Sequence, residues 1–128
     1  MAIHSLSFSK RLTALSQSQF QTSLPNIKHG IEREALRVNP TGGMATTVHP
    51  NELGSKLTHD TITTDFSESL MEFITPPEKD PKTTLAQLAD IHKFVYENIG
   101  EERLWPMSMP CFVNKATSIP IAQYGSSN

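Results

Sequence analysis

Four acidic residues stand in segments that are otherwise apolar or β-branched, where carboxylates are uncommon. They are Glu32, Glu34, Asp65 and Glu72. Burying an unpaired carboxylate is costly, so each needs either a cationic partner or contact with water. Mg²⁺ and Mn²⁺ prefer such hard oxygen ligands and usually take one or two carboxylates together with water and phosphate oxygens. The four residues are therefore candidate ligands for Mg²⁺, with Mn²⁺ as a possible substitute.

The segment that carries the first two acids is IEREALRVN, followed by the turn sequence NPTGG. Its Glu, Arg, Ala and Leu residues favour a helix locally, but its short length and the dense turn signal favour a strand over residues 31–39. Side chains alternate along a strand, so Glu32 and Glu34 share one face, about 7 Å apart. That spacing suits one ion or two adjacent ions. The competing interpretation is a water-exposed strand face on which the two carboxylates have no role.

Two further strands are predicted around the other two acids. The β-branched sequence TITT favours a strand immediately before Asp65. The sequence LMEFI, closed by two prolines, places Glu72 and Ile74 on one face, and Met71 and Phe73 on the other. Neighbouring strands would then bring all four carboxylates to one surface.

The sequence DPKTTLAQLADIHKFVYENIG predicts a helix, with Asp80 as the N-cap, Pro81 in the first turn and Gly100 just past the end. Its apolar face is predicted to consist of Leu85, Leu88, His92, Val95 and Ile99. On such a face, His92 is interpreted as a core residue with satisfied hydrogen bonds and not as a metal ligand.

The regions on either side are less regular. Phe8, Leu12 and Leu15 are spaced as one face of a short amphipathic helix, which we prefer to a faint resemblance of this Ser-rich start to a transit peptide. The segment RLWPMSMPC, residues 103–111, cannot be helical because each of its two prolines removes a backbone donor. Its large apolar residues predict that it packs on a core or lines a pocket.

Composition limits the function. The chain has 128 residues, the size of one domain, and a net charge of −2, which does not suggest a partner such as nucleic acid or an anionic membrane. The single cysteine, Cys111, allows no internal disulfide and suits a reducing, cytoplasmic location, with a buried thiol as the simplest interpretation. No glycine-rich phosphate loop, dinucleotide fingerprint or zinc-ligand spacing is present. Any contact with nucleotide phosphates would therefore run through metal ions.

Three stretches together resemble a known family. GIEREALRVNPTGGMATTVHPNELGSKLTHDTITTDFSESLMEFITPP, IGEERLWPMSMPC and IAQYGSSN follow the order and nearly the spacing of the N-terminal part of glutamate–cysteine ligases (γ-glutamylcysteine synthetases) of the proteobacterial type. The resemblance runs from Gly30 to Asn128, whereas the first 29 residues match only as a leading helix. It implies an α+β fold: part of a curved, mainly antiparallel sheet similar to that of glutamine synthetase, with flanking helices and a concave active-site face.

The resemblance also implies an activity. In this family ATP phosphorylates the γ-carboxylate of L-glutamate, and the amino group of L-cysteine attacks the γ-glutamyl phosphate to give γ-glutamylcysteine, the precursor of glutathione. Carboxylates on the sheet bind Mg²⁺ there, and by motif position they correspond to Glu32, Glu34, Asp65 and Glu72.

Family members are several times longer than this chain. Residues 1–128 are therefore expected to form the N-terminal portion of a single larger catalytic domain, inactive alone. Residues 1–29 would be a leading helix and loop, and residues 30–128 the sheet and helix segment with the metal-binding carboxylates. Two alternatives stay open: another ATP-dependent carboxylate–amine ligase with a different amine acceptor, and a non-catalytic metal-binding module.

Overall fold

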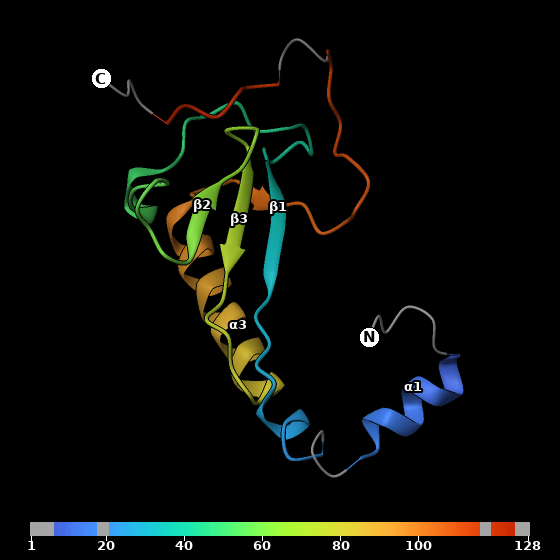
Figure 1. Cartoon of the computed structure of the whole chain (residues 1–128). Coiled ribbons are helices and arrows are strands. Elements are labelled where there is room, and N and C mark those ends of the chain that lie inside the picture. The colour runs from blue at the N-terminus through green and yellow to red at the C-terminus, as the bar shows by residue number, and fades with distance from the viewer. Residues whose placement is uncertain (1–6, 18–20, 116–118, 125–128) are drawn as a thin grey trace.

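The structure, a computed structural model, describes residues 7–17, 21–115 and 119–124. At its centre lies a four-stranded antiparallel sheet in the order β2-β3-β1-β4 (Figure 1). The strands are β1 (Glu32–Val38), β2 (Ile62–Thr64), β3 (Leu70–Ile74) and β4 (Arg103–Leu104). One long helix packs behind this sheet, so the predicted α+β class and the antiparallel pairing are both confirmed.

β1 is a strand despite the helical preference of its residues. It lies between two neighbours and pairs with β3 along one edge and with β4 along the other. Backbone hydrogen bonds on both edges outweigh propensity differences of a few tenths of a kcal/mol per residue. The alternation that was predicted for β1 therefore holds, and it fixes which side chains face the helix.

The long helix α3 (Pro81–Asn98) begins and ends as predicted. The Asp80 carboxylate accepts a hydrogen bond from the amide of Lys82 at 3.0 Å, and Gly100 has a φ of 60° just past the helix, a conformation that glycine adopts without strain. The prediction that Leu85 lies on the buried face is wrong, because Leu85 is 61% exposed. Thr84 is buried instead, and its hydroxyl donates to the carbonyl of His29 at 3.2 Å, which sets the rotation of the first helical turn.

The hydrophobic core lies between α3 and the sheet face that α3 covers. Its buried members are Ala35, Leu53, Ile62, Met71, Phe73, Leu88, Val95, Ile99 and Leu104. His92 is half-buried beside this cluster, and its ring meets that of Phe73 edge-on at 5.2 Å. Burial and the nearby Arg33 lower the pKa of His92, which keeps the ring neutral. The core location was predicted correctly, but Nε2 of His92 is buried with no hydrogen-bond partner among the described residues.

The leading helix α1 (Phe8–Leu15) forms as predicted but lies apart from the sheet (Figure 1). Its apolar residues Phe8, Leu12 and Leu15 are exposed. A 3₁₀ turn (Leu24–Asn26) follows before the chain enters β1, and the parts of the predicted leading region at 1–6 and 18–20 lie outside the described residues. Of the helices in the described ranges, none combines the length and the apolar character that crossing a membrane requires.

Candidate metal-binding face

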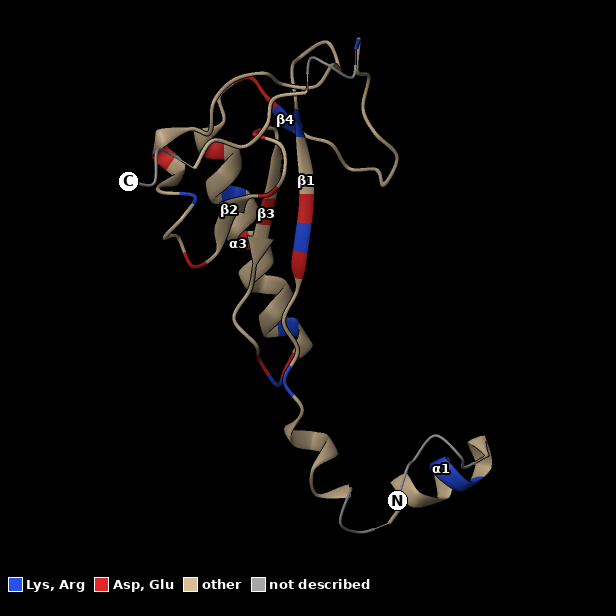
Figure 2. Ribbon diagram, turned by 45° about the horizontal axis from the view of Figure 1, so that its top comes forward, with Lys and Arg blue, Asp and Glu red and all other residues tan. Residues whose placement is uncertain are grey.

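The sheet face opposite α3 carries three of the four predicted acids. Glu34 on β1 lies directly across from Glu72 on β3, and Glu32 lies across from Ile74 two positions along. Directly paired residues of an antiparallel ladder point to the same side, so Glu32, Glu34 and Glu72 share the face away from the core. Figure 2 shows acidic residues on adjacent stretches of β1 and β3.

Asp65 reaches the same surface from the end of β2. It follows the last β2 residue directly, and its amide donates to the carbonyl of Leu70, the first residue of β3, at 2.9 Å. This bond closes the ladder between the two strands. Asp65 is half-buried there, whereas Glu32 and Glu34 are exposed.

The pKa of Glu72 responds to the charges of the other three carboxylates. Burial raises the pKa of Glu72, and the negative charges of Glu32, Asp65 and Glu34 raise it further. Among the described residues, the ion pairs are Arg37 with Glu102 and Lys56 with Glu68, so none of the four acids has a Lys or Arg partner within 4 Å. The face therefore holds uncompensated negative charge, which a bound cation would neutralise.

The donor set fits a hard divalent cation, although the described residues do not form a closed cage for one. No three His, Cys, Asp or Glu side chains in the described ranges surround a common point closely enough to hold a metal ion by themselves. Mg²⁺ commonly keeps several waters and takes one or two carboxylates together with substrate phosphates. An open carboxylate face of this kind suits that mode of binding, with the remaining ligands supplied by water or by a phosphorylated substrate.

The segment 103–111 lines a hollow next to these acids, as predicted for its apolar residues. The hollow, about 340 Å³, is bounded by Glu34 and Leu36 of β1 together with Trp105, Met107 and Met109. The indole nitrogen of Trp105 donates to the carbonyl of Met109 at 2.7 Å and fixes the shape of this irregular stretch. Apolar side chains therefore lie beside Glu34, one of the candidate ligands. Cys111, at the end of the segment, is buried, and burial raises the pKa of its thiol.

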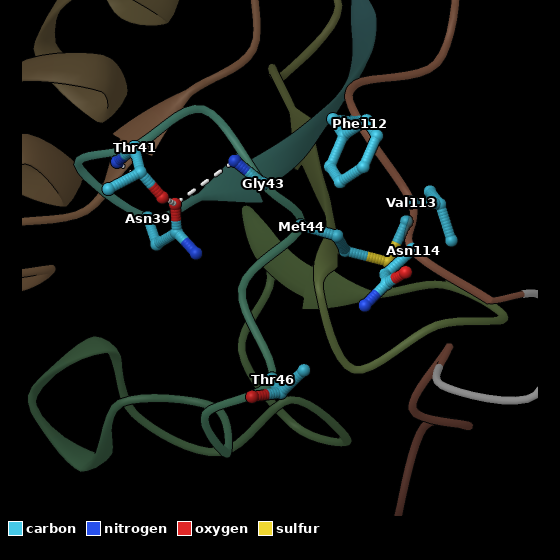
Figure 3. Close-up of a pocket in the computed structure, with 8 residues that line it drawn as sticks. All are labelled: Asn39, Thr41, Gly43, Met44, Thr46, Phe112, Val113 and Asn114. Carbon is cyan, nitrogen blue, oxygen red and sulfur yellow. Dashed lines mark hydrogen bonds between the residues drawn. The ribbon is translucent and has the colours of Figure 1, made fainter.

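A second hollow, about 380 Å³, lies at the far end of β1 (Figure 3). It is lined by Asn39, Thr41, Gly43, Met44, Thr46, Phe112, Val113 and Asn114. The Asn39 side chain shapes the turn, because its Oδ1 accepts from the amides of Thr41 and Gly43, each at 3.0 Å. The sequence predicted this turn, but nothing in it indicated that residues 112–114 would lie opposite.

Sequence reasoning also missed a buried acid, Glu68, within the turn between β2 and β3. Glu68 is 4% exposed; its carboxylate accepts from Lys56 at 2.6 and 2.7 Å, from the amide of His49 at 2.9 Å and from that of Gln123 at 2.8 Å. Burial alone would raise the pKa of Glu68, but these hydrogen bonds hold it below its usual value. Unlike the four acids on the open face, Glu68 is fully paired and serves to join three segments.

The fold and its acidic face define the class of protein. It is an α+β protein whose sheet packs one face against a helix and carries carboxylates on the other. The family model for glutamate–cysteine ligase matches residues 12–128. The chain therefore belongs to the glutamate–cysteine ligase family.

Individual relatives agree with this assignment. The chain is 57% identical over 106 residues to the glutamate–cysteine ligase of Sodalis glossinidius. The aligned residues make up 83% of this chain and 20% of that protein. It is 51% identical over all 128 residues to the enzyme of Pseudoalteromonas translucida, of which it covers 24%. The chain thus spans about a fifth to a quarter of the length of these relatives.

Solved structures show the same fold. The crystal structure of the glutamate–cysteine ligase from Francisella tularensis in complex with AMP superimposes with a TM-score of 0.73 at 41% identity, covering 77% of this chain and 20% of that one. A bifunctional glutathione synthetase from Pasteurella multocida gives a TM-score of 0.76 at 37% identity, covering 82% of this chain and 14% of that one.

Proposed function

We propose that this chain contributes to a cytoplasmic glutamate–cysteine ligase, which uses ATP to join L-cysteine to the γ-carboxylate of L-glutamate. The product would be γ-glutamylcysteine for glutathione synthesis, formed through a γ-glutamyl phosphate. The observation that carries the proposal is the direct pairing of Glu34 with Glu72 on the open sheet face, with no cationic partner among the described residues, in a chain of this family.

In this proposal Glu32, Glu34, Asp65 and Glu72 hold Mg²⁺, which Mn²⁺ could replace. The bound ion would supply charge neutralisation at the phosphate oxygens during phosphoryl transfer. The protein's own contribution is position: the ladder between β1 and β3 fixes the backbones of three of the acids, and the ladder between β2 and β3 fixes the fourth. The AMP in the Francisella structure supports an adenine nucleotide as co-substrate.

We further propose that residues 1–128 act as the N-terminal portion of a single larger catalytic domain, because the relatives are about four times as long. The open face would then be completed by groups from the rest of that domain. The purified 128-residue chain is expected to release no ADP in the presence of glutamate and cysteine, and to bind Mg²⁺ only weakly. A coupled assay for ADP and calorimetric titration with MgCl₂ would check this. ADP release that requires both amino acids would contradict the proposal.

The substrate assignment is tested on the larger ligase proposed above, which would contain these residues. It is expected to show its highest kcat/KM with L-cysteine when glutamate and ATP are offered with a panel of amines, and mass spectrometry should identify γ-glutamylcysteine as the product. Preference for another amine would favour a different ATP-dependent carboxylate–amine ligase. Metal binding without any ADP release, with every amine tried, would favour a non-catalytic metal-binding module.

A further inference from the structure

The segment 119–124 lies along the turn that joins β2 to β3, the turn that begins with Asp65. The carbonyl of Pro120 accepts from the amide of Glu68 at 2.9 Å, and the amide of Ala122 donates to the carbonyl of Phe66 at 3.0 Å. Residues more than 50 positions apart in the chain thus form a short antiparallel contact. This contact brings Tyr124 to the edge of the acidic face.

The Tyr124 hydroxyl is directed at the backbone of the candidate ligand itself. It donates to the carbonyl of Thr64 and is 3.0 Å from the carbonyl of Asp65. One hydroxyl proton is shared between these two acceptors. Since the amide of Asp65 is already bonded to Leu70, the backbone of Asp65 is fixed on its amide side by β3 and on its carbonyl side by Tyr124.

The ring of Tyr124 is held in place from the other side. Lys56 Nζ lies 5.7 Å from the ring centroid, and the same ammonium group is bound by both oxygens of Glu68. The Glu68 carboxylate also accepts from the amide of Gln123, the residue before the tyrosine. Burial, Asp65, Glu68 and Glu72 all raise the pKa of Tyr124, so the hydroxyl stays protonated and remains a donor.

We infer that Tyr124 is a positioning residue for the metal-binding face: its hydroxyl holds the Asp65 backbone so that the Asp65 side chain faces Glu72. The inference rests on the proposed function, because it requires Asp65 to be a metal ligand. Tyr124 acts through Asp65 and supplies no ligand of its own. Groups that orient metal ligands in this way commonly change metal affinity by about 10- to 100-fold when they are removed.

The chain offers a matched pair of variants, because it has two tyrosines. Tyr124→Phe removes the donor and keeps the ring beside Lys56. Tyr96→Phe makes the same chemical change on α3, where Tyr96 is 45% exposed. Each ¹⁵N-labelled chain is titrated with MnCl₂, and the loss of intensity of each amide signal is followed by NMR. A paramagnetic ion broadens nearby signals even when it binds weakly, so the 128-residue chain is suitable.

In the wild-type chain and in Tyr96→Phe, the amides of Asp65, Glu34 and Glu72 are expected to broaden over one range of Mn²⁺ concentration. In Tyr124→Phe all three amides should require about tenfold more Mn²⁺, because one bound ion broadens them together. The melting temperature without metal should stay close to that of the wild type. A merely structural role would lower the melting temperature together with the response to Mn²⁺.

Three results would overturn the inference. Equal broadening of Asp65 in Tyr124→Phe and wild type would remove the positioning role and leave the metal-binding face intact. A large loss of melting temperature in Tyr124→Phe would show that the hydroxyl stabilises the fold in general. Absence of broadening at all three acids in the wild-type chain would remove the metal assignment, and the role of Tyr124 with it. Glu72→Gln serves as the positive control, because loss of this ligand should weaken the broadening of all three amide signals by Mn²⁺.

Discussion

Replacing Glu72 by Gln in the larger ligase proposed above is expected to lower kcat by about 100-fold or more, because an amide of the same shape cannot neutralise a bound cation. Glu72 is the acid most central to the face: it lies opposite Glu34, and its pKa responds to the charges of the other three. Steady-state kinetics at several MgCl₂ concentrations would measure the effect. Glu32→Gln should act in the same direction.

The same substitution should not destabilise the metal-free protein. A carboxylate whose pKa is raised in the folded state binds its proton more tightly there than in the unfolded chain, so it contributes stability at low pH that is lost as the pH rises through the folded pKa. At neutral pH the charged Glu72 opposes folding, and Gln removes that opposition. Thermal melts without metal should show an unchanged or higher midpoint above pH 7.

The matched control is Glu97→Gln, at an exposed position of α3, away from the acidic face. It is expected to leave both kcat and the melting midpoint unchanged. If Glu72→Gln were as active as Glu97→Gln at saturating Mg²⁺, the carboxylates would not be metal ligands. If it lost activity together with its fold, the effect would be structural and not catalytic.

Arg37→Met is expected to lower the free energy of unfolding by about 3–5 kcal/mol, the usual cost of removing one partner of a buried ion pair. Arg37 is 0% exposed, and its guanidinium lies 2.7 Å from the Glu102 carboxylate. It also donates to the carbonyl of Thr47 at 2.8 Å and to that of Glu68 at 2.9 Å. Removing it would take this donor from four acceptors: the Glu102 carboxylate, the Thr47 hydroxyl and the carbonyls of Thr47 and Glu68. Urea unfolding followed by circular dichroism would measure the loss.

Two further variants identify the cause. Arg103→Met changes an exposed arginine on the neighbouring strand β4 and should cost less than about 1 kcal/mol. Arg37→Met combined with Glu102→Gln should recover part of the loss, because the double variant no longer leaves a charge unpaired. If the double variant were as unstable as the sum of its single changes, the ion pair would not be the source of the stability.

Local patterns predicted the elements that carry the candidate site. Alternation along β1 and β3 placed the acids on one face and Met71 and Phe73 on the other, and the structure confirms it. The cap at Asp80 and the glycine after the helix fixed both ends of α3. These signals act over a few residues, so a sequence displays them directly. Residue chemistry made the four acids candidate ligands, the family resemblance assigned Mg²⁺ to them, and that assignment stays a proposal.

Long-range contacts account for what the sequence did not reveal. Alternation put Arg37 on the core face, but its burial depends on Glu102, which lies 65 positions away. The rotation of α3 that exposes Leu85 depends on the bond from Thr84 to His29, 55 positions apart. The contact of Tyr124 with Asp65 spans 59 positions. A local sequence pattern cannot predict such pairings, because the contacts exist only after the sheet has formed.

The direct pairing of Glu34 with Glu72 also limits where residues can be inserted or deleted in β1 and β3. A one-residue slip of β3 would turn Glu72 toward α3 and Met71 and Phe73 toward solvent, and a one-residue slip of β1 would turn Glu32 and Glu34 toward α3. A similar deletion between residues 50 and 60, in the connection that precedes β2, leaves that pairing intact. Changes in length are therefore expected to be tolerated better in the connections than within β1 or β3.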